Sequence, residues 1–149
     1  MALAPALEAS LGPVGRVLAF AREPWWIIGS AAVALHAAKS VEAVDVDVLI
    51  GLEDASQLFP ALGLPVRPGA ADPRFRSDLF ATWRANSLPV EFMAGFALQE
   101  AGRFRRIQLL TREVAEVGGH VCYFPGRDEL KRLLERFGRP KDLAHAALL

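Results

Sequence analysis

Residues 44–50 read Val-Asp-Val-Asp-Val-Leu-Ile, and this segment constrains the fold more than any other. Side chains of a β-strand alternate between two faces, so a strand over 44–50 places Asp45 and Asp47 on one face. Two carboxylates on an otherwise apolar strand are costly unless they are solvated, paired or bound to a cation. Carboxylate oxygens suit Mg²⁺. The alternative is a solvent-facing strand with two surface aspartates.

The chain has 149 residues, which predicts a single domain over residues 1–149. Hydrophobic residues make up 52% and charged residues 23%, which excludes intrinsic disorder. The longest weakly polar run, 25–38, is too short to span a bilayer, and the first residues do not resemble a signal peptide. The single cysteine, Cys122, cannot form an internal disulfide. We therefore expect a soluble cytoplasmic domain without membrane contact.

The net charge is zero, but the two signs are unevenly distributed. Residues 1–66 hold seven acids and three bases, whereas residues 67–149 hold ten acids and fourteen bases. An acidic part and a basic part can form a cleft with a metal on one wall and phosphates on the other. A dipolar surface without a function is the alternative.

The remaining patterns predict an α+β domain, a mixed β-sheet flanked by helices. Pro24 is expected to end the first helix, Gly29-Ser30 to form a tight turn, and Asn86-Ser87 and Gly118-Gly119 to connect hairpins. Helices are predicted over 6–22, 31–39, 53–62, near 127–137 and from 140 toward 149. Strands are predicted over 25–28, 44–50, 79–85, 88–94, 107–117 and 120–124.

Gly29 and Ser30 lie between a predicted buried strand and a predicted helix. Glycine lets a ligand approach the backbone, and serine offers a hydroxyl and a helix cap. Free N–H groups at a helix start attract phosphate. An ordinary helix cap is the alternative interpretation.

Glu91 is a third carboxylate on a predicted apolar strand, with Val90 and Phe92 pointing to the opposite face. Three carboxylates that share a cation suit two-metal phosphoryl or nucleotidyl transfer. We therefore expect Asp45, Asp47 and Glu91 to converge on neighbouring strands. Taken alone, Glu91 is more typical of a surface residue on an edge strand.

The order of these features resembles the polymerase-β-like nucleotidyltransferase superfamily. Ile28-Gly29-Ser30 is followed by fourteen residues, by Asp45-Val46-Asp47, and later by Glu91. Residues 138–144, Gly-Arg-Pro-Lys-Asp-Leu-Ala, are similar to a segment of small bacterial members, including relatives of abortive-infection toxin nucleotidyltransferases. The resemblance extends from about residue 24 to residue 149.

This resemblance implies a nucleotidyltransferase-like fold and an enzyme that uses Mg²⁺ or Mn²⁺. The enzyme would move a nucleoside monophosphate from an NTP such as ATP to a hydroxyl acceptor: RNA, a protein, or a small molecule such as an aminoglycoside. A homodimer or a partner protein could complete the pocket. The implied metal ligands and catalytic residues are Asp45, Asp47 and Glu91. The implied nucleotide-binding residues are Gly29, Ser30, Lys131, Arg139 and Lys141.

The chain departs from the superfamily pattern at several polar positions. Many small members carry Arg-x-Thr-x before the first aspartate, where this chain has Val41 and Ala43. They often carry a lysine where this chain has Leu134, which we expect to be packed among apolar residues. These departures support the alternative of a catalytically degenerate module that binds nucleotides or proteins.

A second basic cluster, Arg103 to Arg106 with Phe104 at its centre, lies outside these motifs. Interleaved basic and aromatic residues can contact nucleic acid or a triphosphate. A solvated loop is the preferred interpretation.

Overall fold

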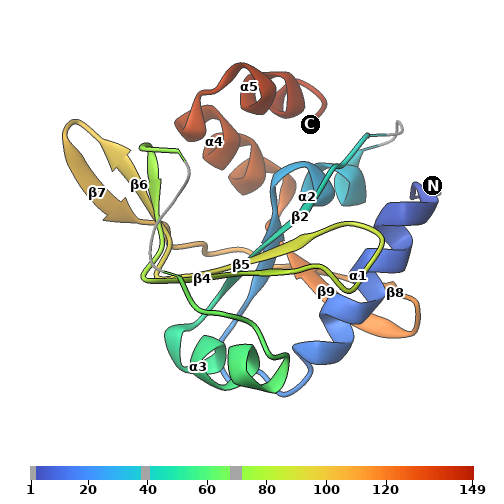
Figure 1. Cartoon of the computed structure of the whole chain (residues 1–149). Helices are drawn as coiled ribbons and strands as arrows, with labels where there is room; N and C mark the ends of the chain where they lie inside the picture. The colour runs from blue at the N-terminus through green and yellow to red at the C-terminus, as the bar shows by residue number, and fades with distance from the viewer. Residues whose placement is uncertain (1–2, 38–40, 68–71) are drawn as a thin grey trace.

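A four-stranded mixed sheet forms the centre of the molecule (Figure 1). The structure is a computed structural model that describes residues 3–37, 41–67 and 72–149. The strand order is β1–β2–β5–β4; β2 and β5 run parallel, and the other two pairs are antiparallel. The strands are β1 (Trp26–Ile28), β2 (Val46–Ile50), β4 (Leu79–Trp83) and β5 (Val90–Ala94).

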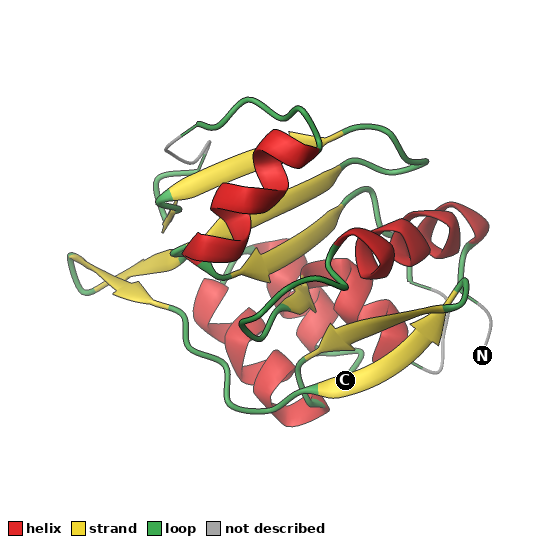
Figure 2. Ribbon diagram, turned by 90° about the horizontal axis from the view of Figure 1, so that it is seen from below, coloured by secondary structure: helices red, strands yellow, loops and turns green. Residues whose placement is uncertain are grey.

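One face of this sheet carries the core. Val46, Val48, Val90 and Phe92 are fully buried on it. Helices α1 (Pro5–Val17) and α3 (Leu52–Ala61) contact these strands, and Figure 2 shows α3 lying across the sheet. Burial of each such side chain contributes about 1.5–3 kcal/mol, so the alternation in the sequence fixes which face points inward.

Three helices lie on the side of the sheet away from α3 (Figure 1). They are α2 (Gly29–His36), α4 (Arg127–Phe137) and α5 (Pro140–Ala146). Leu134 is 0% exposed on the buried stripe of α4, as predicted. Gly138 ends α4 with a φ of 71°, a left-handed conformation that glycine adopts at low cost.

Two smaller sheets complete the fold. The predicted hairpin is formed by β8 (Glu113–Val117) and β9 (His120–Phe124). The other sheet was not predicted. Its strands, in the order β3–β6–β7, are β3 (Phe75–Arg76), β6 (Ala97–Glu100) and β7 (Arg103–Arg106). The prediction of a loop over the Arg103–Arg106 cluster is therefore wrong. All four residues of β7 are exposed, so no buried alternation marks them as a strand in the sequence.

Long-range hydrogen bonds explain why two elements differ from their predicted bounds. The first helix ends at Val17 rather than at residue 22, because the N–H groups of Arg22 and Glu23 donate to the buried Asp54 carboxylate on α3. Strand β8 begins at Glu113 rather than at residue 107. The preceding N–H groups of Leu110 and Thr111 donate to the Glu129 carboxylate on α4, not to a neighbouring strand.

Other boundaries shift by a few residues. Gly29 and Ser30 form the first turn of α2 rather than a separate turn before it. Strand β2 begins at Val46, so Asp45 precedes it. The hairpin strands β4 and β5 stop at Trp83 and start at Val90, and α5 ends at Ala146. Residues 38–40, the predicted end of the second helix, lie outside the described residues. Within the described ranges, no helix combines the length and apolar character that a membrane crossing requires.

Candidate functional site

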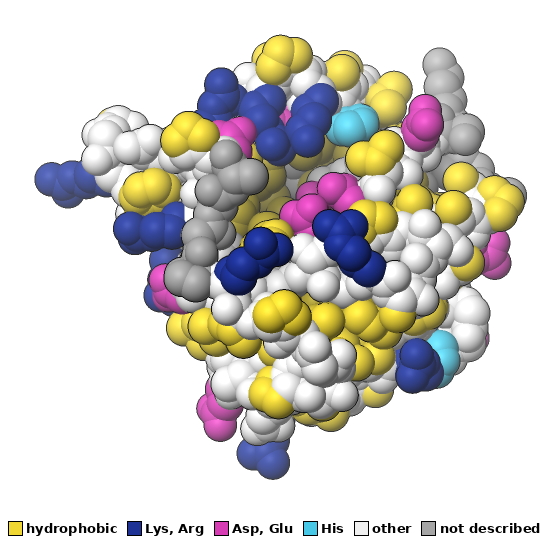
Figure 3. Space-filling model, in the orientation of Figure 1, with side chains coloured by type: hydrophobic (Ala, Val, Ile, Leu, Met, Phe, Trp, Pro, Cys, Tyr) yellow, Lys and Arg dark blue, Asp and Glu magenta, His cyan; other side chains and the backbone are white. Residues whose placement is uncertain are grey.

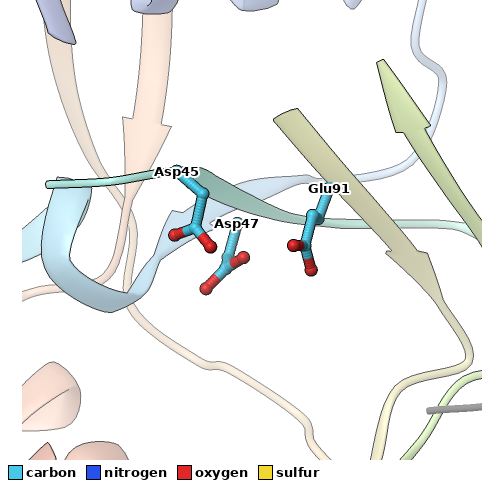
Figure 4. Close-up of side chains that lie close together, drawn as sticks. All are labelled: Asp45, Asp47 and Glu91. Atoms are coloured by element: carbon cyan, nitrogen blue, oxygen red, sulfur yellow. The ribbon is translucent and has the colours of Figure 1, made fainter. Parts of the chain in front are cut away.

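Three carboxylates meet on the face of the sheet opposite the core. Asp47 on β2 and Glu91 on β5 are register partners in the parallel pair, and Asp45 lies just before β2. One carboxylate oxygen from each residue lies within 4.8 Å of the other two. Figure 4 shows the three side chains pointing into the same space. The expected convergence is therefore confirmed, although β5 is a central strand and not the edge strand considered for Glu91.

Gly29 lies directly beside this cluster. Its φ is 66°, and a Cβ added to it would lie 3.0 Å from Oδ2 of Asp47. A side chain at this position would therefore be strained and would also press on the carboxylate. Ser30 follows in the first turn of α2 and is half-buried. The predicted Gly-Ser element thus brings the backbone at the start of α2 next to Asp47.

The carboxylates repel one another in a partly buried site. Burial, followed by the charges of Asp45 and Glu91, raises the pKa of Asp47 to about 8. Burial and the charge of Asp45 also raise the pKa of Glu91. A divalent cation would relieve this repulsion, and three closely spaced carboxylate oxygens match the ligand preference of Mg²⁺ and Mn²⁺. The donor set therefore fits the predicted metal.

Two of the three predicted cations act on these carboxylates. The charges of Lys141 and Arg139, at the start of α5, lower the pKa of Asp47, and Lys141 also lowers the pKa of Glu91. Lys131 is exposed on α4, and its charge does not contribute to either shift. The structure thus brings two cations of the predicted set close to the acidic cluster and leaves one apart.

Arg139 is held in place by several contacts. Its Nε donates to Oδ2 of Asp142 at 2.6 Å and its Nη2 to Oδ1 at 3.1 Å. Asp142 is 3% exposed and also accepts the backbone N–H of Arg139, so the pair caps α5. The guanidinium lies over the ring of Phe75, 4.7 Å from its centroid. The Arg-Pro-Lys-Asp segment therefore orients one cation and leaves Lys141 exposed.

One cation near the site, Arg84, was not predicted from the sequence. Its charge lowers the pKa of Glu91. Arg84 directly follows β4, two residues beyond Thr82, the register partner of Glu91. The hairpin register would have revealed this residue, because alternate residues share a face. Figure 3 shows the acidic residues in a central hollow with basic side chains above and below it.

A cavity of about 540 Å³ lies further along the same face of the sheet. Leu49 and Met93 contribute to its lining; they are register partners two residues beyond Asp47 and Glu91. Trp26, Phe96 and Leu109 add further apolar surface. None of the three carboxylates lines this cavity, which begins about 7 Å along the strands from them, given a rise of roughly 3.3 Å per residue.

Metal binding to this cluster should stabilise the fold in a pH-dependent way. Protons compete with the cation for Asp47, so the increase in Tm with millimolar Mg²⁺ or Mn²⁺ should grow as the pH rises toward 8. A metal concentration one hundred times the Kd adds about 2.7 kcal/mol to the free energy of unfolding. Without metal the pH dependence of stability has the opposite sign, because Asp47 keeps a proton in the folded state that it loses in the unfolded state. The free energy of unfolding therefore falls as the pH rises from about 4 to about 8. Thermal melts at several pH values test both trends, and a midpoint unmoved by either metal would contradict the metal site.

The fold, and not the sequence, relates this chain to known proteins. No family model matches the sequence, and no curated protein matches it. The fold matches solved structures at low sequence identity. A protein of Thermotoga maritima, provisionally assigned as a nucleotidyltransferase, has a TM-score of 0.72 and 19% identity over 90% of this chain and 86% of its own.

Two further similar structures are a lincosamide antibiotic adenylyltransferase and an antibiotic-resistance factor. The lincosamide adenylyltransferase LnuA, with lincomycin bound, has a TM-score of 0.58 and 10% identity over 97% of each chain. The antibiotic-resistance factor ANT(2'')-Ia has a TM-score of 0.54 and 14% identity over 91% of this chain and 79% of its own. The chain therefore has the nucleotidyltransferase fold, which confirms the predicted fold class. The resemblance to abortive-infection toxins is not tested by these structures and stays a prediction.

Proposed function

We propose that this protein is a nucleotidyltransferase that depends on Mg²⁺ or Mn²⁺. It transfers a nucleoside monophosphate from an NTP to an acceptor hydroxyl: the acceptor oxygen bonds to the α-phosphorus as the bond to pyrophosphate breaks. The observation that carries the proposal is the Asp45, Asp47 and Glu91 cluster, with Asp47 and Glu91 opposite each other on parallel strands. The nucleotidyltransferase fold, which matches over 90% of this chain, supports it.

Each residue of the site has a role in this proposal. Asp45, Asp47 and Glu91 hold the divalent cation, which would stabilise charge on the phosphates and activate the acceptor oxygen. Glu91 also accepts the proton of the acceptor hydroxyl. Gly29 and Ser30 admit the triphosphate beside Asp47. Lys141 and Arg139 neutralise its charge.

The acceptor is proposed only by class: RNA, a protein, or a small molecule of the antibiotic type. LnuA is a lincosamide adenylyltransferase, so ATP is the first nucleotide to test. A second copy of the chain or a partner protein would complete the acceptor pocket.

The alternative is a module that retains the fold but no longer turns over. Leu134 and Val41 favour it, because both stand where many small members carry polar residues and both are buried. Such a module would bind nucleotides without needing a metal, or would bind a protein.

Calorimetric titration with the four NTPs distinguishes the two functions. The enzyme should bind at least one NTP in the presence of Mg²⁺ or Mn²⁺, and Asp47→Ala should lose that binding. Pyrophosphate release with the same NTP would then identify transfer. NTP binding that is independent of metal and unchanged in Asp47→Ala would support the degenerate module instead.

A further inference from the structure

The cavity of about 540 Å³ beside the start of α3 is a site that the proposed transfer does not use. Its floor is one row of cross-strand neighbours: Trp26 on β1 pairs with Leu49 on β2, which pairs with Met93 on β5. The carboxylates belong to the next row on the same face, where Asp47 pairs with Glu91. The cavity is therefore separate from the carboxylate cluster, although both lie on one face of the sheet.

Much of the cavity lining is apolar and held in place by hydrogen bonds. Residues 107–109 line it together with Phe96, whose backbone oxygen accepts the N–H of Ile107 at 3.0 Å. The indole Nε1 of Trp26 donates to the backbone oxygen of Thr111 at 2.9 Å, which fixes the ring at the edge of the floor. Trp26 is half-buried, so part of its ring is open to the cavity. A cavity of this volume with such a lining is typical of sites for small organic molecules.

The charges of the cavity are not balanced. Three charged residues line it: Glu23, Glu53 and Arg106. Arg106 pairs with Asp78, so its charge is already compensated. Neither glutamate forms an ion pair with any residue in the described ranges. The cavity therefore has two carboxylates that no cation of the protein neutralises.

Both glutamates lie at the start of α3. Glu53 is in its first turn, and the carboxylate of Glu23 lies against Gly51, where an added Cβ would lie 2.2 Å from Oε1. A helix N-terminus favours carboxylates, but it carries only roughly half a positive charge. The buried Asp54 in the same turn adds a third acid. The helix end therefore does not cancel the negative charge, and this end of the cavity suits a cation.

We propose that this cavity binds a small organic cation, a molecule with an apolar or aromatic body and a protonated amine. The body lies on Trp26, Leu49 and Met93, and the amine faces Glu23 and Glu53. The ring of Trp26 adds to the preference, because the face of an aromatic ring attracts a cation. An uncharged ligand leaves both carboxylates without a partner, and an anion is repelled by them. The binding requires neither the metal nor the proposed transfer activity.

Ligand-observed NMR titration with three naphthalene derivatives of similar size tests the proposal. Naphthylmethylamine is a cation, naphthylmethanol is neutral, and naphthoate is an anion. In EDTA, the wild type should bind the amine at least about fivefold more tightly than the alcohol, and the naphthoate most weakly. Glu23→Gln/Glu53→Gln should weaken binding of the amine about fivefold and leave binding of the alcohol unchanged, because it removes charge and hardly any volume. Both side chains are exposed, so this variant should fold like the wild type.

A charge of the opposite sign should reverse the preference. Leu52 lines the cavity at the start of α3 and is 37% exposed, so Leu52→Lys introduces a cation without disturbing the core. This variant should bind the amine more weakly and the naphthoate more tightly than the wild type does. A preference that stays the same would contradict the assigned position of the ligand.

Glu8→Gln/Glu116→Gln is the matched control, because it neutralises two exposed acids that do not line the cavity. It should bind the amine like the wild type. Asp47→Asn should also bind the amine normally in EDTA, which separates this site from the carboxylate cluster and from the fate of the transfer activity. Equal affinity for the amine and the alcohol, equal weakening in the cavity and control variants, loss of the amine in Asp47→Asn, or no saturable binding of the amine at millimolar concentration would each overturn the proposal.

Discussion

Asp47→Asn should lower nucleotide transfer by about three orders of magnitude or more and should at the same time stabilise the metal-free fold. Asp47 is the member of the cluster with a pKa of about 8, because burial and two neighbouring carboxylates oppose its ionisation. An amide has nearly the same shape but carries no charge, so it removes this repulsion together with a metal ligand. The gain in Tm without metal should be largest above pH 8, where Asp47 is ionised in the folded protein.

A radiolabelled transfer assay and thermal melts in EDTA measure the two effects. Glu42→Gln is the matched control, since Glu42 is an exposed acid nearby in sequence that lies outside the Asp45, Asp47 and Glu91 cluster. It should change neither quantity appreciably. Transfer that survives in Asp47→Asn would contradict the assigned site, and a lower Tm without metal would contradict the account of its electrostatics.

Lys141→Ala should lower transfer by about two to three orders of magnitude. The charge of Lys141 lowers the pKa of both Asp47 and Glu91. Within the described residues it forms no ion pair, so its ammonium group is available to the triphosphate. The loss should appear chiefly in the transfer rate, because charge develops on the phosphates in the transition state.

Lys131→Ala provides the control within the same chain. Lys131 is also an exposed lysine of the C-terminal helices, but its charge does not act on the carboxylates. We expect its transfer rate to stay within about a factor of two of the wild type. Equal losses in both variants would indicate a general effect of surface charge and not a site at the start of α5.

The carboxylate cluster could be predicted from the sequence because its information is local. Alternation along β2 decides that Val46 and Val48 point to the core, which leaves Asp47 on the other face. The same rule applies to Glu91 between Val90 and Phe92. The position of β5 in the middle of the sheet depends on how all the strands pair. It therefore cannot be predicted from the sequence of any single segment.

Two of the boundaries that were missed depend on distant partners, and one hairpin depends on a local turn. The buried Asp54 accepts the N–H groups that end the first helical region, and it lies more than thirty residues away in the chain. Glu129 similarly holds the chain before β8. The β6–β7 hairpin turns at Ala101 and Gly102, which both have positive φ, and an alanine in that conformation carries no signal in the sequence.

The parallel pairing of β2 with β5 also has a consequence for how the protein folds. The two strands that carry Asp47 and Glu91 are separated in the chain by α3 and two other strands, so their pairing closes a long loop. Loop closure of this kind costs entropy before any contact compensates for it, and topologies rich in such pairings fold slowly. The carboxylates can therefore meet only once this long-range pairing has formed. The proposed cation would bind with full affinity only to chains that have completed this step, so metal affinity would report directly on the native topology.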